Sequence, residues 1–311
     1  MRKLALTIGD PSGIGPEITA KALQRLDAFP DVSLTVIGSL GALMQAAHSI
    51  GAILPQNSQV TYRDIIAASP GAVSYMAIGQ AVAMLATGEA QALVTGPISK
   101  KNLHEAGHDF PGHTEILQDM ARRMFKAPDA HADMLFVHKK FRLLLLTRHI
   151  ALADVAPALS KQGAIARPLK TLIRFLRDHA QVDEPRIALL GLNPHAGEIG
   201  NGEEEKFFRP VIRAVNGVGA SKLEGPFAAD AFFRDFDPEK TPYDAVVAAY
   251  HDQGLIPFKL LAGYEAVNVT IGLPFIRTSV GHGTAEDIAG KGVARADGMM
   301  AAIRGALNFI S

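Results

Sequence analysis

The chain has 311 residues, of which 48% are hydrophobic and 20% are charged, with 31 basic and 31 acidic side chains. This neutral balance favours a small-molecule ligand over a nucleic acid or a membrane surface. The chain has no cysteine, which excludes disulfides, thiolate metal sites and cysteine nucleophiles, so a metal would be bound by His, Asp or Glu. No apolar run approaches the roughly 20 residues that span a bilayer, and the first one is too short for a signal sequence. We therefore expect a cytoplasmic protein.

The first 125 residues alternate between strand and helix patterns. A β-rich run at residues 4–8 leads into a glycine- and proline-rich turn, GDPSGIGPE, and then into apolar residues at helical spacing. The next predicted elements are strands at 32–37 and 92–95 and helices at 40–47 and 72–85, with an irregular connection around 58–71. This order predicts βα units in a mainly parallel sheet.

The pattern changes near residue 132, where two strand signals follow one another. Residues 134–137 and 142–147 are joined by the basic turn His138-Lys139-Lys140, which predicts a hairpin in a second lobe. The remaining predicted elements are helices at 163–178, 203–215 and 297–309, strands at 186–192 and 245–249, and an irregular stretch at 227–237. The length is that of about two domains at roughly 150 residues each.

Three histidines stand in the same setting, each just after a predicted strand. His149 follows RLLLLTR, His195 follows IALLGLNP, and His251 follows AVVAAY. Because open α/β folds place ligands at the carboxyl ends of their strands, three such imidazoles could converge on one divalent metal and leave an open position. A single histidine at a strand end is more often a hydrogen-bonded structural residue, so both interpretations stay open.

Two further groups are candidates for binding an anion. Lys259, Asn268 and Arg277 follow one another at intervals of nine residues, and two cations with an amide in one cleft would bind a phosphate or carboxylate. Exposure to water is the alternative for each of them. The GDPSGIGPE turn precedes a helix, whose N–H groups could bind an anion, although Asp10 could equally cap the turn.

The segment GHTE is ambiguous in a similar way. Thr114 and Glu115 could serve as the cap and the first-turn acid of the helix ILQDMARRMF. A capping motif does not need His113, which therefore remains a candidate binding residue.

Motifs along nearly the whole chain resemble those of one enzyme family. In order they are GDPSGIGPE, TGPISK, GHTE, GLNPHAGE, YHDQGLIPFK, VNVTIGLPFIRTS and HGTAEDIAGKG. Together they are similar to the 4-hydroxythreonine-4-phosphate dehydrogenase family of vitamin B6 synthesis. The last motif also resembles the cofactor loop of isocitrate and isopropylmalate dehydrogenases, which share that family's fold.

The resemblance implies an α/β fold of two α/β/α lobes with a cleft between them, as in isocitrate and isopropylmalate dehydrogenases. Residues 1–125 and 282–311 would form the first lobe, which carries the cofactor loop. Residues 126–281 would form the second lobe, with the metal ligands and the dimer interface. The protein would be a homodimer whose active site is shared between the subunits.

The resemblance also implies a role for each site residue. His149, His195 and His251 would bind a divalent cation, for which we favour zinc over magnesium, manganese or cobalt. The residues implied to contact the phosphorylated substrate are His113, Thr114, Lys259, Asn268 and Arg277, and Asp230 is implied as a catalytic residue near the same cleft. The residues implied to hold the nicotinamide cofactor are His282, Gly283, Thr284, Ala285, Asp287 and Gly292. An aspartate such as Asp287, facing a ribose 2′-hydroxyl, predicts NAD rather than NADP.

The implied reaction is the NAD-dependent, metal-assisted oxidation and decarboxylation of 4-phosphooxy-L-threonine in pyridoxal phosphate synthesis. Departures from the family pattern at Arg148, Ala231 and Gly281 lie beside site residues and leave the exact substrate open. One alternative keeps the chemistry with 4-phospho-threonate, 4-phospho-erythronate or a dihydrodiol dicarboxylate as substrate. An alternative of another class is a non-catalytic protein that binds phosphorylated metabolites.

Overall fold

The computed structural model describes residues 1–310, and the chain divides into two compact units. Unit 1 comprises Met1–Ala132 and the chain from Tyr264 onward, and unit 2 comprises Asp133–Gly263. No helix in the described residues is long and apolar enough to cross a membrane.

The second boundary lies earlier in the chain than the predicted residue 281. The cause is strand pairing: β11 (Ile276–Val280) pairs in parallel with β4 (Ala92–Thr95), and β10 (Val267–Ile271) pairs with β11. These ladder hydrogen bonds tie both strands to unit 1. A hydrophobic pattern along the sequence locates strands but does not say which sheet they join.

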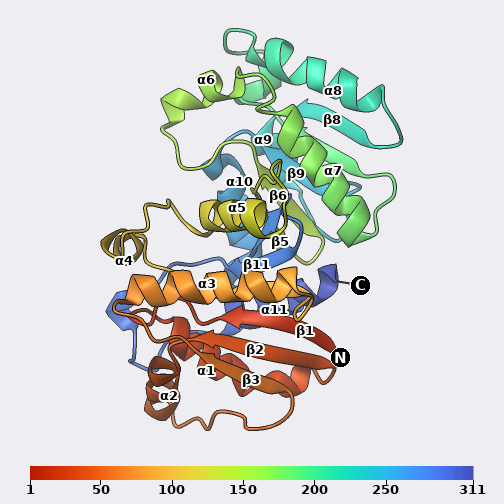
Figure 1. The fold of residues 1–311 in the computed structure, drawn as a ribbon. Coiled ribbons are helices and arrows are strands. Elements are labelled where there is room, and N and C mark those ends of the chain that lie inside the picture. The colour runs from red at the N-terminus through yellow and green to blue at the C-terminus, as the bar shows by residue number, and fades with distance from the viewer. Residues whose placement is uncertain (311) are drawn as a thin grey trace. The chain divides into compact units, whose positions relative to one another are not determined.

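Unit 1 is built on a sheet whose strands lie in the order β3-β2-β1-β4-β11-β10; β3, β2 and β1 lie side by side in Figure 1. The other strands are β1 (Arg2–Thr7), β2 (Val32–Gly38) and β3 (Val60–Asp64). All neighbouring pairs are parallel except the antiparallel pair of β10 and β11, so the predicted mainly parallel sheet is confirmed. β3 lies in the stretch predicted to be irregular, because this edge strand buries only Val60 and carries no alternating apolar signal.

Helices cover both faces of this sheet. They are α1 (Gly15–Leu23), α2 (Leu40–Ser49), α3 (Pro70–Ala86), α4 (Lys100–Glu105), α5 (His113–Met124) and α11 (Asp297–Phe309). α3 lies along the sheet (Figure 1), and the apolar cluster around it includes Ala5 and Leu93 from the strands. Leu4 and Val94, one residue away on the same strands, point to the opposite face and are equally buried. Burial on both faces explains why these strands are continuously apolar.

Unit 2 carries a sheet of strand order β5-β6-β9-β7-β8. Its strands are β5 (Asp133–His138), β6 (Phe141–Leu145), β7 (Arg186–Leu190), β8 (Lys222–Phe227) and β9 (Ala245–Ala248). β5 and β6 form the predicted antiparallel hairpin, and the other neighbouring pairs are parallel. The carboxyl ends of β6, β7 and β9 therefore lie at one edge of this sheet.

The helices of unit 2 include one that falls in a stretch predicted to be irregular. They are α6 (Val155–Leu159), α7 (Ala166–Ala180), α8 (Arg209–Asn216), α9 (Ala229–Arg234) and α10 (His251–Ala262). The prediction for 227–237 was wrong at α9, whose phenylalanines pack against one another and against Phe227 and Phe236. Consecutive aromatic residues gave this short helix no apolar periodicity.

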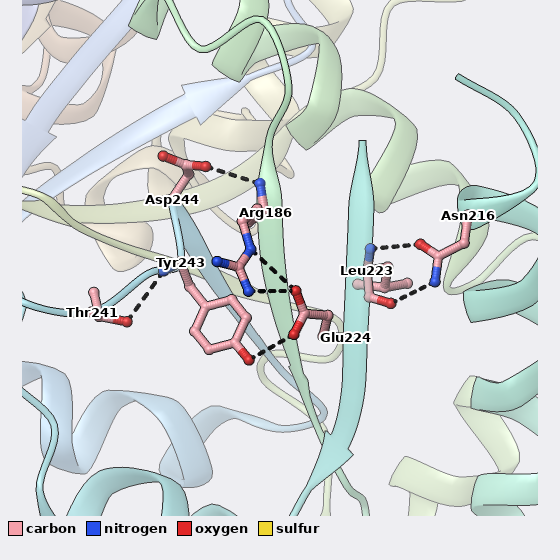
Figure 2. Close-up of polar contacts among 7 residues, drawn as sticks. All are labelled: Arg186, Asn216, Leu223, Glu224, Thr241, Tyr243 and Asp244. Atoms are coloured by element: carbon pink, nitrogen blue, oxygen red, sulfur yellow. Dashed lines mark hydrogen bonds and ion pairs between the residues drawn. The ribbon is translucent and has the colours of Figure 1, made fainter. Parts of the chain in front are cut away.

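A polar network lies where β7 and β9 begin (Figure 2). Arg186 donates from Nε and Nη2 to Glu224 Oε1 at 3.1 and 2.8 Å, and Tyr243 Oη donates to Glu224 Oε2 at 3.1 Å. The backbone N–H of Arg186 donates to Asp244 Oδ2 at 2.8 Å. The hydrogen bonds from Arg186 lower the pKa of the Glu224 carboxyl. Because α/β folds bind ligands at the opposite ends of their strands, we assign this network a structural role.

Candidate active site

One cationic side chain of unit 1 is buried without a counter-ion. Arg277, on β11, is only 2% exposed, and burial lowers its pKa to about 9. Its Nε and Nη2 donate to Thr95 Oγ1 at 3.0 and 2.6 Å, and its Nη1 donates to Thr270 Oγ1 at 3.0 Å. Within residues 1–310 no carboxylate forms an ion pair with this guanidinium. A guanidinium has five N–H donors, so two of them remain for a ligand.

Two threonines outside the predicted site hold this guanidinium in place. Thr95 ends β4, and Thr270 lies directly opposite Arg277 in the ladder of β10 and β11. Hydroxyl groups satisfy N–H donors without neutralising the charge, so the site keeps a positive charge that an anion can compensate. A threonine in a predicted strand is too common for the sequence to have indicated this role.

His113 and Asn268 add two more polar groups to the same region. His113 begins α5, and its Nε2 is shielded from solvent and has no hydrogen-bond partner among the described residues. Burial, and then the charge of Arg277, holds the pKa of His113 well below its usual value, with an opposing hydrogen bond to the Gly96 backbone. The imidazole is therefore neutral at pH 7. Asn268 Oδ1 is likewise buried and lacks a partner within residues 1–310.

These side chains are brought together by strand geometry. Asn268 precedes Thr270 by two residues on β10, so both point to the same face of the sheet, where Thr270 contacts Arg277. Rotation of the Asn268 amide presents either its oxygen or its N–H₂ group to a ligand. A buried cation, a neutral imidazole and a free amide are a set of groups suited to binding an anion such as a phosphate.

Thr114 follows His113 in α5 and is partly buried, but it does not cap the helix. The N-cap residue is Gly112, and no side chain accepts a hydrogen bond there. Glu115 lies in the first turn, as one interpretation of GHTE predicted. The capping role considered for Thr114 was wrong, and its role in binding substrate stays a prediction.

Several backbone N–H groups of the GDPSGIGPE turn have hydrogen-bond partners within the protein. The backbone N–H groups of Asp10, Gly13 and Ile14 donate to the carbonyls of Pro97, Asp10 and Thr284. Asp10 Oδ1 accepts from the backbone N–H of Ser12 at 2.9 Å, so Asp10 caps the turn. The capping alternative for Asp10 is therefore confirmed, and anion binding at the start of the following helix stays a prediction.

Two of the three predicted metal ligands lie together in unit 2. His149 follows β6 and His251 begins α10 after β9, and the two imidazole rings are 5.8 Å apart between centroids. They line a pocket of about 380 Å³. His251 Nδ1 lies 2.6 Å from Asp252 Oδ1, a contact that fixes the ring and leaves Nε2 available to a ligand. The pairing of β6 with β9 brought these strand ends together.

His195 stands apart from this pair. It lies in the turn Pro194–Gly197 after β7, is exposed, and adopts a left-handed φ of 56°. Within residues 1–310, no three or more His, Asp or Glu side chains are placed to hold a metal ion. The 5.8 Å between the ring centres of His149 and His251 is compatible with two ligands of one ion, since zinc-bound nitrogens at about 2 Å would place the ring centres roughly 5–6 Å apart. The convergence of all three histidines stays a prediction.

The other predicted residues of unit 2 lie on exposed surface. Lys259 is on α10 and Asp230 is on α9, and both are exposed. Arg148 was noted only as a departure from the family pattern, yet it lines the pocket of His149 and His251. Its Nη1 is shielded from solvent and has no hydrogen-bond partner among the described residues. Arg148 thus adds a guanidinium group to the lining of this pocket.

The predicted cofactor residues lie in a loop of unit 1. His282, Gly283 and Asp287 are exposed, Thr284, Ala285 and Gly292 are partly buried, and the only regular structure is the 3₁₀ turn Glu286–Ile288. Just before the loop, a Cβ atom at Gly281 would lie 3.0 Å from the Ala266 carbonyl oxygen. This close approach gives a physical reason for glycine at a position where the family pattern has a larger residue. The binding of a cofactor by the loop stays a prediction.

These features define the class: an α/β protein with a buried, uncompensated arginine in one unit and a histidine-lined pocket in the other. A family comparison matches residues 16–306 to the family described as Pyridoxal phosphate biosynthetic protein PdxA. The chain belongs to this family, which confirms the prediction made from its motifs.

Individual relatives agree with the family match. The 4-hydroxythreonine-4-phosphate dehydrogenase of Trichlorobacter lovleyi is 39% identical over 97% of this chain and 96% of its own. The crystal structure of the enzyme of that name from Klebsiella pneumoniae is 33% identical, covers 99% of both chains and has a TM-score of 0.83. A terephthalate 1,2-cis-dihydrodiol dehydrogenase from Burkholderia xenovorans is 26% identical over 99% of this chain and 98% of its own, with a TM-score of 0.64.

Proposed function

We propose that this chain is a dehydrogenase that oxidises and decarboxylates 4-phosphooxy-L-threonine with NAD, as a step of pyridoxal phosphate synthesis. The observation that carries the proposal is the buried, uncompensated Arg277 beside the neutral His113. A folded protein tolerates such a cation when a ligand supplies the counter-charge, and a substrate phosphate does so. Relatives along nearly the full length bear the name 4-hydroxythreonine-4-phosphate dehydrogenase, which supports this choice of phosphate ester.

In this proposal the anion site binds the substrate phosphate and orients the rest of the molecule. The two free N–H donors of Arg277 hold phosphate oxygens, and the Asn268 amide and the His113 ring nitrogen complete the hydrogen bonds. Since His113 is neutral and its other ring nitrogen donates to the Gly96 backbone, Nε2 accepts from a protonated phosphate oxygen. Exclusion of water around these groups strengthens each contact.

His149 and His251 would hold a divalent metal, with Asp252 fixing the orientation of the His251 ring. A bound metal would act as a Lewis acid toward the substrate oxygens. The nicotinamide cofactor would be bound by the loop at 282–292 and would accept the hydride. Asp287 is exposed there and free to accept a hydrogen bond from a ribose 2′-hydroxyl, which favours NAD over NADP.

A second copy of the chain would complete the metal site in this proposal. Large apolar side chains on and near α10 are exposed: Ile256 at 66% and Leu260 at 84%, which are one helical turn apart. Leu152, which lines the histidine pocket, is 70% exposed. Exposed apolar side chains beside a pocket that brings only two imidazoles together support a homodimer with a shared active site.

Arg148 favours a second candidate substrate. A substrate ammonium group in the pocket of His149 and His251 would be repelled by the positive charge of Arg148, which lines that pocket. A 4-phospho-threonate or 4-phospho-erythronate carries a hydroxyl in place of that ammonium. The second candidate is therefore the same oxidation and decarboxylation, with a phosphorylated hydroxy acid as substrate in place of the phosphorylated amino acid.

NADH formation by the purified, metal-supplemented protein tests both candidates. The assay compares 4-phosphooxy-L-threonine with 4-phospho-threonate and 4-phospho-erythronate, each with NAD and with NADP. Preference for the amino acid supports the first candidate, and preference for a hydroxy acid supports the second. Tight substrate binding without NADH from any of the three would indicate a binding protein instead.

A further inference from the structure

The loop that follows β11 is held by two side chains of α1. Residues 281–296 form no strand and no α-helix, so no sheet ladder fixes their position. Glu17, only 1% exposed, accepts from the backbone N–H of Gly292 through Oε2 at 3.1 Å and of Ala294 through Oε1 at 2.8 Å. Lys21, one turn along α1, donates from Nζ to the carbonyls of Gly292 at 2.8 Å and Ala294 at 2.7 Å.

Lys21 and Glu17 are also bonded to each other, at 2.9 Å between Nζ and Oε1. An ammonium group has three N–H donors, and all three are used. The pair thus satisfies both the N–H and the carbonyl of Gly292 and of Ala294. Charge-assisted bonds of this kind are about twice as strong as neutral ones. We refer to this arrangement of Glu17, Lys21, Gly292 and Ala294 as the latch.

A second contact holds the other end of the same loop. The Thr284 carbonyl accepts from the backbone N–H of Ile14 at 2.8 Å. Gly13 makes this approach possible, since a Cβ atom there would lie 2.7 Å from the Thr284 carbonyl oxygen and 2.9 Å from Thr284 Cβ. The GDPSGIGPE segment therefore forms hydrogen bonds with the loop at Thr284 and again at Gly292. Between these two points Asp287 remains exposed.

We propose that Glu17 and Lys21 are positioning residues for cofactor binding: the latch fixes the loop in the conformation that receives NAD. This inference rests on the proposed function, in which residues 282–292 bind the cofactor. Neither side chain needs to touch NAD. Each acts through the loop backbone, which would otherwise have to be ordered at the expense of binding free energy. The glycine- and proline-rich turn of residues 9–17 thus supports the cofactor loop in this proposal.

The test is steady-state NADH formation by the full-length, metal-supplemented protein carrying Lys21→Met, which removes the ammonium and keeps most of the apolar stem. The KM for NAD should rise about tenfold or more, the equivalent of about one lost charge-assisted hydrogen bond, while the KM for the phosphorylated substrate stays within about twofold. Lys21→Arg, which keeps the charge, should restore part of the affinity for NAD. The matched control is Lys101→Met. Lys101 lies on α4, its side chain is 82% exposed, and its ion pair is with Glu105, outside the loop.

Gly13→Ala perturbs the second contact without altering the latch, and it keeps the test valid if Lys21→Met does not fold. It should raise the KM for NAD in the same selective way. Wild-type turnover with an unchanged KM for NAD in both variants overturns the inference and leaves the proposed function standing. Absence of NADH from the wild-type protein overturns the proposed function, and this inference falls with it.

Discussion

Replacing Arg277 by methionine should weaken substrate binding and yet stabilise the ligand-free protein. Burial lowers the Arg277 pKa to about 9, several units below its ordinary value, which corresponds to roughly 5 kcal/mol of cost for the buried charge at about 1.36 kcal/mol per pH unit. The three hydrogen bonds to Thr95 and Thr270 return roughly 3 kcal/mol, at about 1 kcal/mol each. Arg277→Met removes both the cost of the buried charge and the three hydrogen bonds. The variant should therefore be more stable by about 2 kcal/mol, as found when buried charges are replaced by apolar groups.

The assay is urea unfolding of both proteins, with and without inorganic phosphate. Phosphate should raise the free energy of unfolding of the wild type and leave that of Arg277→Met almost unchanged, since only the wild type binds it. Above pH 9 the unfolded wild type binds more protons at this arginine than the folded protein does, so the stability of the wild type rises with pH. The advantage of the variant should therefore shrink above pH 9.

Two results would refute this reasoning about Arg277. A ligand-free variant clearly less stable than the wild type would mean that the guanidinium stabilises the fold even when no anion is bound. Equal stabilisation of both proteins by phosphate would mean that phosphate binds elsewhere. In either case the assignment of the substrate phosphate to this site would have to be withdrawn.

The remaining predictions concern four other side chains. Asp252→Asn should lower the metal affinity of the pocket about 10- to 100-fold by releasing the His251 ring, and unchanged metal content after dialysis would remove Asp252 from this role. Asp287→Asn should raise the use of NADP relative to NAD, measured as the ratio of kcat/KM values, whereas a constant ratio would count against a ribose contact. Leu260→Glu should shift a dimer toward monomers in sedimentation and abolish turnover, and an active monomer would contradict a shared site. The folded pKa of His113 lies well below its unfolded value, so the wild type should lose stability as pH falls below about 6.5, and His113→Asn should lose less; parallel pH profiles would show that His113 is not buried in solution.

The amino-acid sequence by itself determined the α/β class, the hairpin of β5 and β6, and the family. Strands buried on both faces are apolar along their length, and a basic turn between two such runs leaves few alternatives to a hairpin. The family followed from motifs spread over nearly the whole chain. The sequence also indicated Arg277 and Asn268 as a cation and an amide suited to an anion, and His113 as a residue that a capping motif does not need.

Only the tertiary structure decided which of these groups share a site and what surrounds them. Thr95 and Thr270 contact Arg277 because β4, β11 and β10 are neighbours in one sheet, and strand order is not encoded in local periodicity. Likewise the latch joins Glu17 to Gly292, which lie 275 positions apart in the chain. The sequence revealed a glycine-rich turn and a glycine-rich loop. Their contact required the folded chain, because hydrogen-bond partners are chosen by proximity in space.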